Sequence, residues 1–278
     1  MWYGGDMNFA RILGFLLWAG CLGAVTPQEE SFLKVWNVHV RSGTDHRAFI
    51  EACQPVMQKA STLGEWLPAV KTLAAWHLYA MGDLSDAERI FESALFKGKA
   101  STSTARFADI QAKRWLTRFD AARVNKALRS YYVTHVEYPA TLAPVLTDVK
   151  SRQLPRVDRF GDAWIYRLEE FSKIKGLANQ RFALYSQTLG REGTSLKTFS
   201  RRAYGEGLEA TILGVKPGRP VLVDFEAVRD GKRERGISGE GAKALNGIRL
   251  VKLATDGSFA LMIDSSGDFW ILAKRARR

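Results

Sequence analysis

The chain contains little cysteine. Only Cys21 and Cys53 occur among its 278 residues. Removal of an N-terminal leader that contains Cys21 would leave Cys53 alone, and no internal disulfide could form. The fold must then rest on its hydrophobic core rather than on covalent cross-links. Cys53 lies in an apolar helical context, which favours a buried small side chain over a reactive thiol.

The chain also lacks the short motifs that carry common chemistry. Its four histidines are scattered, and only His39 and His46 are spaced so that they could share a helix face. Two such ligands without nearby carboxylates do not make a zinc site. "GISGEG" is Gly-rich, but no Lys-Ser/Thr follows it, and no Gly-x-Ser-x-Gly elbow is present. We therefore expect a non-enzymatic protein with no cofactor and no metal.

No long apolar run is present near the N-terminus. Residues 12–25 carry no charge, but this run of 14 residues follows Arg11 and ends at Pro27. A membrane-spanning helix needs about 20 apolar residues. A basic start, a short apolar core and small residues are typical of a secretory signal. Residues 1–26 are therefore predicted to direct export, to the periplasm or to a membrane anchor facing it. A buried core helix is the alternative, but the run lacks a polar face.

Two processing routes are open for this leader. Ala24 is a small residue that suits a general signal peptidase. Alternatively, "LWAGC" places Cys21 as in a bacterial lipoprotein site, where it would be lipidated, although Trp18 stands where that pattern usually has Leu. Met7 is an alternative start of the chain.

The positive charge is unevenly distributed along the sequence. The net charge of +12 divides into −2 for residues 27–98, +9 for residues 99–200 and +5 for residues 201–278. A basic surface of this kind suits nucleic acid, an acidic protein surface or anionic lipid headgroups. Because export argues against nucleic acid, we expect envelope proteins as partners. Association with the membrane, through a lipid anchor or the basic face, is the alternative.

Residues 27–98 form a predicted helical module. Its clearest part has apolar residues at helical spacing in two runs. These are Leu73, Trp76 and Ala80, followed by Ala87, Phe91 and Ala94. Gly82 is expected to end the first helix and Asp83 to cap the second. This antiparallel helix pair, over about residues 66–96, resembles one tetratricopeptide unit.

A long helix is predicted from about 105 to 134, after the small polar loop "GKASTST". It carries two offset apolar stripes, which meet near Asp120. The stripes consist of Ala108, Ala112, Trp115, Phe119 and Ala122, then Val124, Leu128 and Tyr131. The offset predicts either a kink or two helices that meet there, with Asp120 as the cap of the second.

The stretch "VDRFGDAWIYR" raises the question of whether Asp158 is a catalytic residue or a residue that shapes a turn. An Asp can bond backbone amides two residues on, and Gly161 can adopt a positive φ, so the pair predicts a tight turn into a strand. Upstream, Pro139 holds Tyr138 extended and turns the chain away from the long helix. We therefore interpret Asp158 as a turn residue rather than a catalyst.

These features occur in an order that resembles the globular domain of the major pseudopilins of type II secretion systems. The matching positions are Ala127, Leu128, Tyr131, Tyr138, Pro139, Leu142, Asp158, Gly161, Trp164, Tyr166, Phe182, Leu184, Tyr185, Ser186 and Gly190. The resemblance implies a helix packed on a small antiparallel sheet within residues 99–200. The chain departs from that family in two places. Ala19 stands where the family has a Glu, and Glu192 is the only carboxylate of the loop that binds calcium in the family, so neither a filament subunit nor a metal site is expected.

Residues 205–278 alternate short apolar runs with Gly and Pro turns. "TDGS" and "SSGD" separate the last three runs, which predicts a meander within a small β-sandwich or partly open barrel. The segment resembles the periplasmic β-domain of type II secretion clamp proteins, and of lipoproteins that link pilus machinery to its secretin. The whole chain is thus expected to be an α+β protein with a helical module, a pseudopilin-like domain and an all-β domain.

The resemblances imply an accessory or scaffolding part of a type II secretion or type IV pilus-like machinery. An exported envelope scaffold that reuses these folds for another purpose is the first alternative. A basic nucleic-acid-binding protein is the second.

Overall fold

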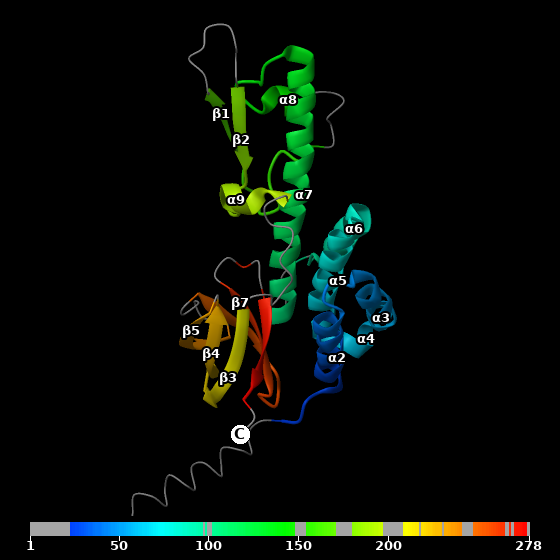
Figure 1. Ribbon diagram of the computed structural model, residues 1–278, viewed down its shortest axis with the longest axis vertical. Helices are drawn as coiled ribbons and strands as arrows, with labels where there is room; N and C mark the ends of the chain where they lie inside the picture. Colours follow the sequence, from blue (N-terminus) through cyan, green and yellow to red (C-terminus); the bar gives the residue numbers. More distant parts are fainter. Residues whose placement is uncertain are drawn as a thin grey trace, which may run out of the picture. The chain divides into compact units, whose positions relative to one another are not determined.

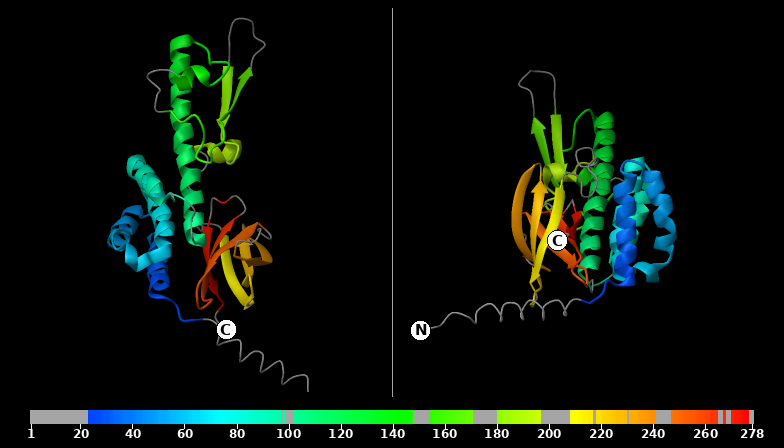
Figure 2. Two further views of the ribbon diagram at one scale, coloured as in Figure 1. Left: turned by 180° about the vertical axis from the view of Figure 1, so that it is seen from behind. Right: turned by 60° about the horizontal axis from the view of Figure 1, so that its bottom comes forward.

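The computed structural model describes residues 23–96, 98, 102–147, 154–170, 180–196, 208–216, 218–229, 231–240, 247–264, 267 and 270–276. These residues are mixed α and β and form two compact units (Figures 1 and 2). Unit 1 holds the described parts of 23–37, 59–66 and 208–276, and unit 2 holds those of 38–58 and 67–196. The sequence predicts a single helical module over 27–98, whereas part of that segment groups with the C-terminal sheet. The predicted leader cleavage and lipidation at Cys21, and the predicted boundaries near 98 and 200–205, fall largely outside the described residues.

A six-stranded sheet forms most of unit 1. Its strands are β3 (Leu208–Lys216), β4 (Leu222–Arg229), β5 (Lys232–Gly239), β6 (Ile248–Leu253), β7 (Phe259–Asp264) and β8 (Trp270–Arg275). Their order is β5-β4-β3-β8-β7-β6, with all pairs antiparallel except β3–β8. The sheet is curled, and its two edge strands meet. Ser238 Oγ of β5 accepts a hydrogen bond from the Leu250 amide of β6 at 3.1 Å. The predicted meander corresponds to β6, β7 and β8.

Strand β5 was not predicted from the sequence, because its first residues, in "KRERGISG", are charged. Residues 232–235 are exposed, and only the end of the strand is buried. Charged side chains are typical of an edge strand, where they discourage pairing with another chain. Gly236 lies opposite Phe225 of β4, and a Cβ at this position would come within 2.9 Å of the Phe225 ring. The glycine therefore makes room for a core aromatic side chain.

The outer face of β7 and β8 is covered by aromatic side chains from earlier in the chain. Phe32 of helix α2 (Pro27–Ser42) stacks on Trp66 of the short 3-10 helix η1 (Gly64–Trp66), with ring centroids 4.4 Å apart. Phe32 also stacks on Phe259 and Trp270. Because both faces of these two strands are covered, their sequences are almost continuously apolar instead of alternating.

Glu29 fixes the start of α2 to the sheet. Thr26 and Glu29 form a capping box, in which each side chain accepts a hydrogen bond from the other's amide, at 2.8 and 3.2 Å. The second carboxylate oxygen of Glu29 accepts hydrogen bonds from the amide and hydroxyl of Thr255. Only 2% of Glu29 is exposed. This side chain therefore accepts hydrogen bonds both from a backbone amide at the start of α2 and from Thr255 in the turn between β6 and β7.

Unit 2 contains the predicted helix pair. Helix α5 (Leu67–Met81) ends at Gly82, whose φ is +87°, and the side chain of Asp83 caps α6 (Leu84–Ala94) by accepting a hydrogen bond from the Asp86 amide. Helix α3 (His46–Gln58) packs against α5. Every residue of the two predicted runs is buried except Ala80, which is exposed.

Helix α7 (Ser103–His135) is continuous, so the predicted kink or break near Asp120 is wrong. The stripe shifts because the helix changes its packing partner along its length. The first half contacts α5 and α6, while Ala121, Val124 and Leu128 face the hairpin of β1 (Ile165–Glu170) and β2 (Gln180–Tyr185) on the other side (Figures 1 and 2). Asp120 lies inside the helix and binds arginine side chains instead of capping.

Val136 ends α7 in the left-handed region, with φ of +64°. A β-branched residue is unfavourable there, and the Val136 side chain is 74% exposed, so little packing offsets the strain.

We expect Val136→Gly to raise the free energy of unfolding by about 1 kcal/mol, because glycine adopts a positive φ without strain. Val133→Gly is the matched control, since Val133 is also exposed but lies inside α7. That substitution is expected to lower stability by about 1 kcal/mol. Urea denaturation of both variants checks the pair, and a destabilising Val136→Gly would contradict the argument.

Among the described residues, no helix has the length and apolar character that a membrane crossing requires.

Candidate functional site

The Asp158 turn leads the chain into the β1–β2 hairpin of unit 2. Oδ1 of Asp158 accepts hydrogen bonds from the amides of Phe160 and Asp162, at 2.9 and 3.0 Å. Gly161 has a φ of +93° and donates its amide to the Asp158 carbonyl oxygen. The bond to the amide two residues on and the positive φ are both as the sequence predicts.

The other oxygen of the Asp158 carboxylate ties this turn to the end of β2. Ser186 Oγ donates a hydrogen bond to Asp158 Oδ2 at 2.5 Å. The Ser186 amide donates to Thr194 Oγ1 of helix α9 (Gly190–Thr194), which begins at Gly190 with φ of +70°. Asp158 and Ser186 are 3% and 0% exposed. The buried carboxylate–hydroxyl pair therefore links the turn to the end of β2.

Most of the remaining motif residues come together in one core beside α7, whereas Tyr185 is not part of it. Trp164 and Leu184 are buried with Ala121, Val124 and Leu128 of the helix. Residues packed around this core are Ala127, Tyr131, Tyr138, Leu142, Tyr166 and Phe182. The register pairs Tyr166 with Leu184, so the two side chains lie on one face of the hairpin. That face is the one predicted to pack on the helix.

The Tyr-Pro corner is held by the same hairpin. Pro139 is buried, and its carbonyl oxygen accepts a hydrogen bond from the Tyr166 hydroxyl at 2.7 Å. Tyr138 packs edge-on against Phe182, with ring centroids 4.7 Å apart. Burial, with smaller contributions from Tyr138 and Tyr131, raises the pKa of Tyr166. The corner therefore fixes where the chain leaves α7.

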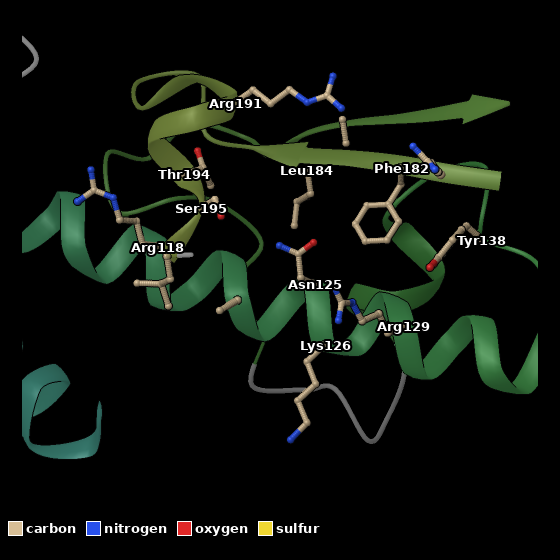
Figure 3. A pocket seen from close by; sticks show the side chains of 14 residues that line it. Arg118, Asn125, Lys126, Arg129, Tyr138, Phe182, Leu184, Arg191, Thr194 and Ser195 are labelled. Carbon is tan, nitrogen blue, oxygen red and sulfur yellow. The ribbon is translucent and has the colours of Figure 1, made fainter. Parts of the chain in front are cut away.

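A cationic groove lies between α7 and the hairpin (Figure 3). Its volume is about 700 Å³. The cationic residues that line it are Arg118, Lys126, Arg129, Arg181 and Arg191, and no Asp or Glu is among the described lining residues. Figure 3 shows Asn125 and Leu184 pointing toward one another across the groove, with Phe182 beside Tyr138. The sequence indicated a basic helix but did not indicate this concave surface.

Three of the four histidines form a cluster in unit 2, in which His39 and His77 are buried and His46 is half-buried. His77 of α5 shares hydrogen bonds with His39 and His46, at 2.9 and 3.0 Å, through its two different ring nitrogens. His39 lies on α2 and His46 on α3, so the suggestion that these two share a helix face is wrong. A neutral ring offers one donor and one acceptor, which satisfies both contacts of His77. The nitrogens face each other rather than a common centre, and among the described residues no His, Cys, Asp and Glu side chains are arranged to hold a metal ion.

His77 is held neutral inside the fold. Burial, and the charges that His39 and His46 would carry, lower the pKa of His77 from 6.5 to about 2. Burial also lowers the pKa of His46, against the opposing effect of Asp45. The ring of Phe49 stacks on His77 with centroids 3.8 Å apart.

Acid is therefore expected to destabilise unit 2. The folded pKa of His77 lies below its unfolded value of 6.5, so the unfolded chain binds more protons between these values. The contribution of neutral His77 to the free energy of unfolding is complete above pH 6.5. It is lost as pH falls below this value, at about 1.4 kcal/mol per pH unit. Between pH 6.5 and 5 we expect a loss of about 2 kcal/mol.

Urea denaturation at several pH values measures this loss. His77→Phe keeps the stack on Phe49 and removes the titrating group, so its stability should depend less on pH by about 2 kcal/mol over the same interval. His135→Phe, at an exposed position of α7, is the matched control and should keep the wild-type dependence. Equal pH dependence in all three proteins would contradict the assignment.

Cys53 is buried, as the sequence predicts, with 1% of the residue exposed. Burial raises the pKa of its thiol to about 12. The thiolate is therefore scarce at neutral pH, which makes Cys53 a packing residue rather than a nucleophile.

Comparison of the chain with protein-family models, with curated proteins and with solved structures finds no match. Inferences about function therefore depend on the residues and geometry described above.

Proposed function

We propose that the protein is a non-enzymatic component of the cell envelope that works by protein–protein contact. Its most specific role would be as an accessory or scaffolding part of a type II secretion or type IV pilus-like machinery. The observation that supports this proposal is the body formed by α7 and the hairpin of unit 2. There Tyr138 of the Tyr-Pro corner and the aromatic residues of the hairpin pack against α7, and the Asp158 turn leads into the hairpin. The pseudopilin resemblance, which stays a prediction, implies a helix packed on a small antiparallel sheet.

The surfaces of both units also support binding over catalysis. The polar groups of the Asp158 turn are used to hold the fold, and His39 and His77 of the His cluster are buried. By contrast, exposed surface offers cations on α7 and the charged strand β5. Charged rims of this kind guide association and select partners.

Purification of the tagged protein from native membranes tests the proposed function. We expect a secretin or pilus-assembly component to copurify with it, and this enrichment to survive nuclease treatment. Recovery of only unrelated envelope proteins would favour the alternative of a scaffold with another purpose. Loss of all partners after nuclease treatment would favour a nucleic-acid-binding protein.

Export is tested separately with a reporter fused after residue 30. We expect reporter activity outside the cytoplasm, because the leader pattern lies within residues 1–26. A reporter that stays in the cytoplasm would contradict the envelope location and the proposed function with it.

A further inference from the structure

The groove beside β2 has unpaired positive charge at its mouth. Arg129 is exposed on α7, and none of the ion pairs found among the described residues involves it. Lys126 is also exposed, but its side chain points away from the hairpin (Figure 3). Arg191, on the opposite wall, is already paired with Glu169 at 3.0 Å. The electrostatic preference of the groove is therefore for an anionic ligand that approaches from the α7 side.

The groove also follows the free edge of a β-strand. Four consecutive residues of β2, 181–184, line it. Successive side chains of a strand point to opposite faces, so a surface that touches four in a row runs along the edge of the strand. Among the described strands β2 pairs only with β1, so no described strand lies along its other edge.

The direction of the Ser186 amide agrees with this geometry. It donates to Thr194 of α9, which also lines the groove, and not to β1. Alternate amides of an extended strand point the same way. The amides of Phe182 and Leu184 should therefore face the same side as that of Ser186.

We propose that this groove binds an extended acidic segment of another protein, which adds to β2 as a third strand. Backbone hydrogen bonds to β2 would supply affinity that does not depend on sequence, and carboxylates near Arg129 would supply specificity. The six residues of β2 match a segment of about six to eight residues. The inference deepens the proposed function by naming the chemistry of the partner, and it rests on that function only in taking a protein as the ligand.

Binding of a labelled peptide to the full chain tests this inference. The probe is a peptide of about eight residues that alternates Glu and Val, and its control alternates Gln and Val. We expect the acidic peptide to bind at least about tenfold more tightly than the control, with an affinity that falls as salt rises. Hydrogen exchange should slow at residues 180–185 in the complex, because added backbone bonds protect the strand edge.

A charge reversal on α7 locates the site. Arg129→Glu should weaken binding by about tenfold, and Arg129→Gln, which removes the charge without reversing it, gives a second variant in case the first misfolds. Arg106→Glu is the control, because Arg106 is exposed on the same helix but does not line the groove. It should change the affinity by less than about twofold.

Three results would overturn the inference. One is equal weakening by the groove variants and by Arg106→Glu, which would indicate general charge attraction. The second is binding of phosphatidylglycerol vesicles or single-stranded DNA, but not of the peptide. The third is peptide binding without protection of residues 180–185. None of these results depends on copurification. If one of them is obtained and a secretin still copurifies, the groove inference is wrong but the proposed function is not contradicted.

Discussion

Asp158→Ala is expected to lower the free energy of unfolding of unit 2 by about 3–5 kcal/mol. The substitution leaves two amides and the Ser186 hydroxyl without the carboxylate that accepts their hydrogen bonds. Each buried donor that loses its acceptor costs about 1–3 kcal/mol, and the turn loses the interaction that shapes it.

Two further variants separate the turn from the link to β2. Asp158→Asn keeps an oxygen for the two amides and should cost about 1–2 kcal/mol. Ser186→Ala removes only the link and should cost a similar amount. Urea denaturation gives the free energies, and hydrogen exchange should show faster exchange of the hairpin than of α5 and α6. A stable Asp158→Ala variant that has lost a biochemical activity would instead restore the catalytic interpretation.

Asp120→Ala is expected to cost about 3–5 kcal/mol as well, because it removes the shared anion of a network at the middle of α7. Asp120 is 1% exposed and pairs with Arg123 and with Arg159 of the Asp158 turn. The two arginines also pair with Glu88 and Glu92 of α6, at 2.5 and 2.8 Å. Without Asp120, two partly buried guanidinium groups lose their common acceptor, and α6, α7 and the turn lose a common contact.

The control for Asp120 is an ion pair that lies in solvent. Arg89 and Asp86 on α6 have exposed side chains, at 70% and 47%, so Arg89→Ala should cost less than about 0.5 kcal/mol. Asp120→Asn keeps the shape but not the charge and should fall between the two. High salt should weaken the exposed pair much more than the buried network. Equal costs for Asp120→Ala and Arg89→Ala would contradict the role of the network.

Local patterns were predictable from the sequence, and contacts between distant residues were not. Asp158 and Gly161 could be assigned to a turn because the interactions that decide it lie within five residues. The stripes of α7 were recognised, but their offset was taken for a kink, because the sequence does not show that the helix packs against different partners along its length. The same limit hid the aromatic cover that Phe32 and Trp66 place over β7 and β8.

The His cluster and β5 escaped prediction for other physical reasons. His77 meets partners 38 and 31 residues away on two other helices, and no spacing rule connects them. A cluster of this kind could be suspected only from a histidine inside an otherwise apolar helix. Strand β5 has charges where a strand usually has alternating apolar residues, because it lies at the edge of the sheet. The groove depends on the approach of α7 to β2, which only the folded chain shows.

Photo-cross-linking in intact cells tests the central claim, that the body of α7 and the hairpin contacts a partner in the envelope. A photoreactive residue is placed at position 129, at the mouth of the groove, and in a second strain at position 106 of the same helix. We predict a discrete adduct with one secretin or pilus-assembly protein from position 129 and none from position 106. Identical adducts from both positions, or no protein adduct from position 129, would contradict the account.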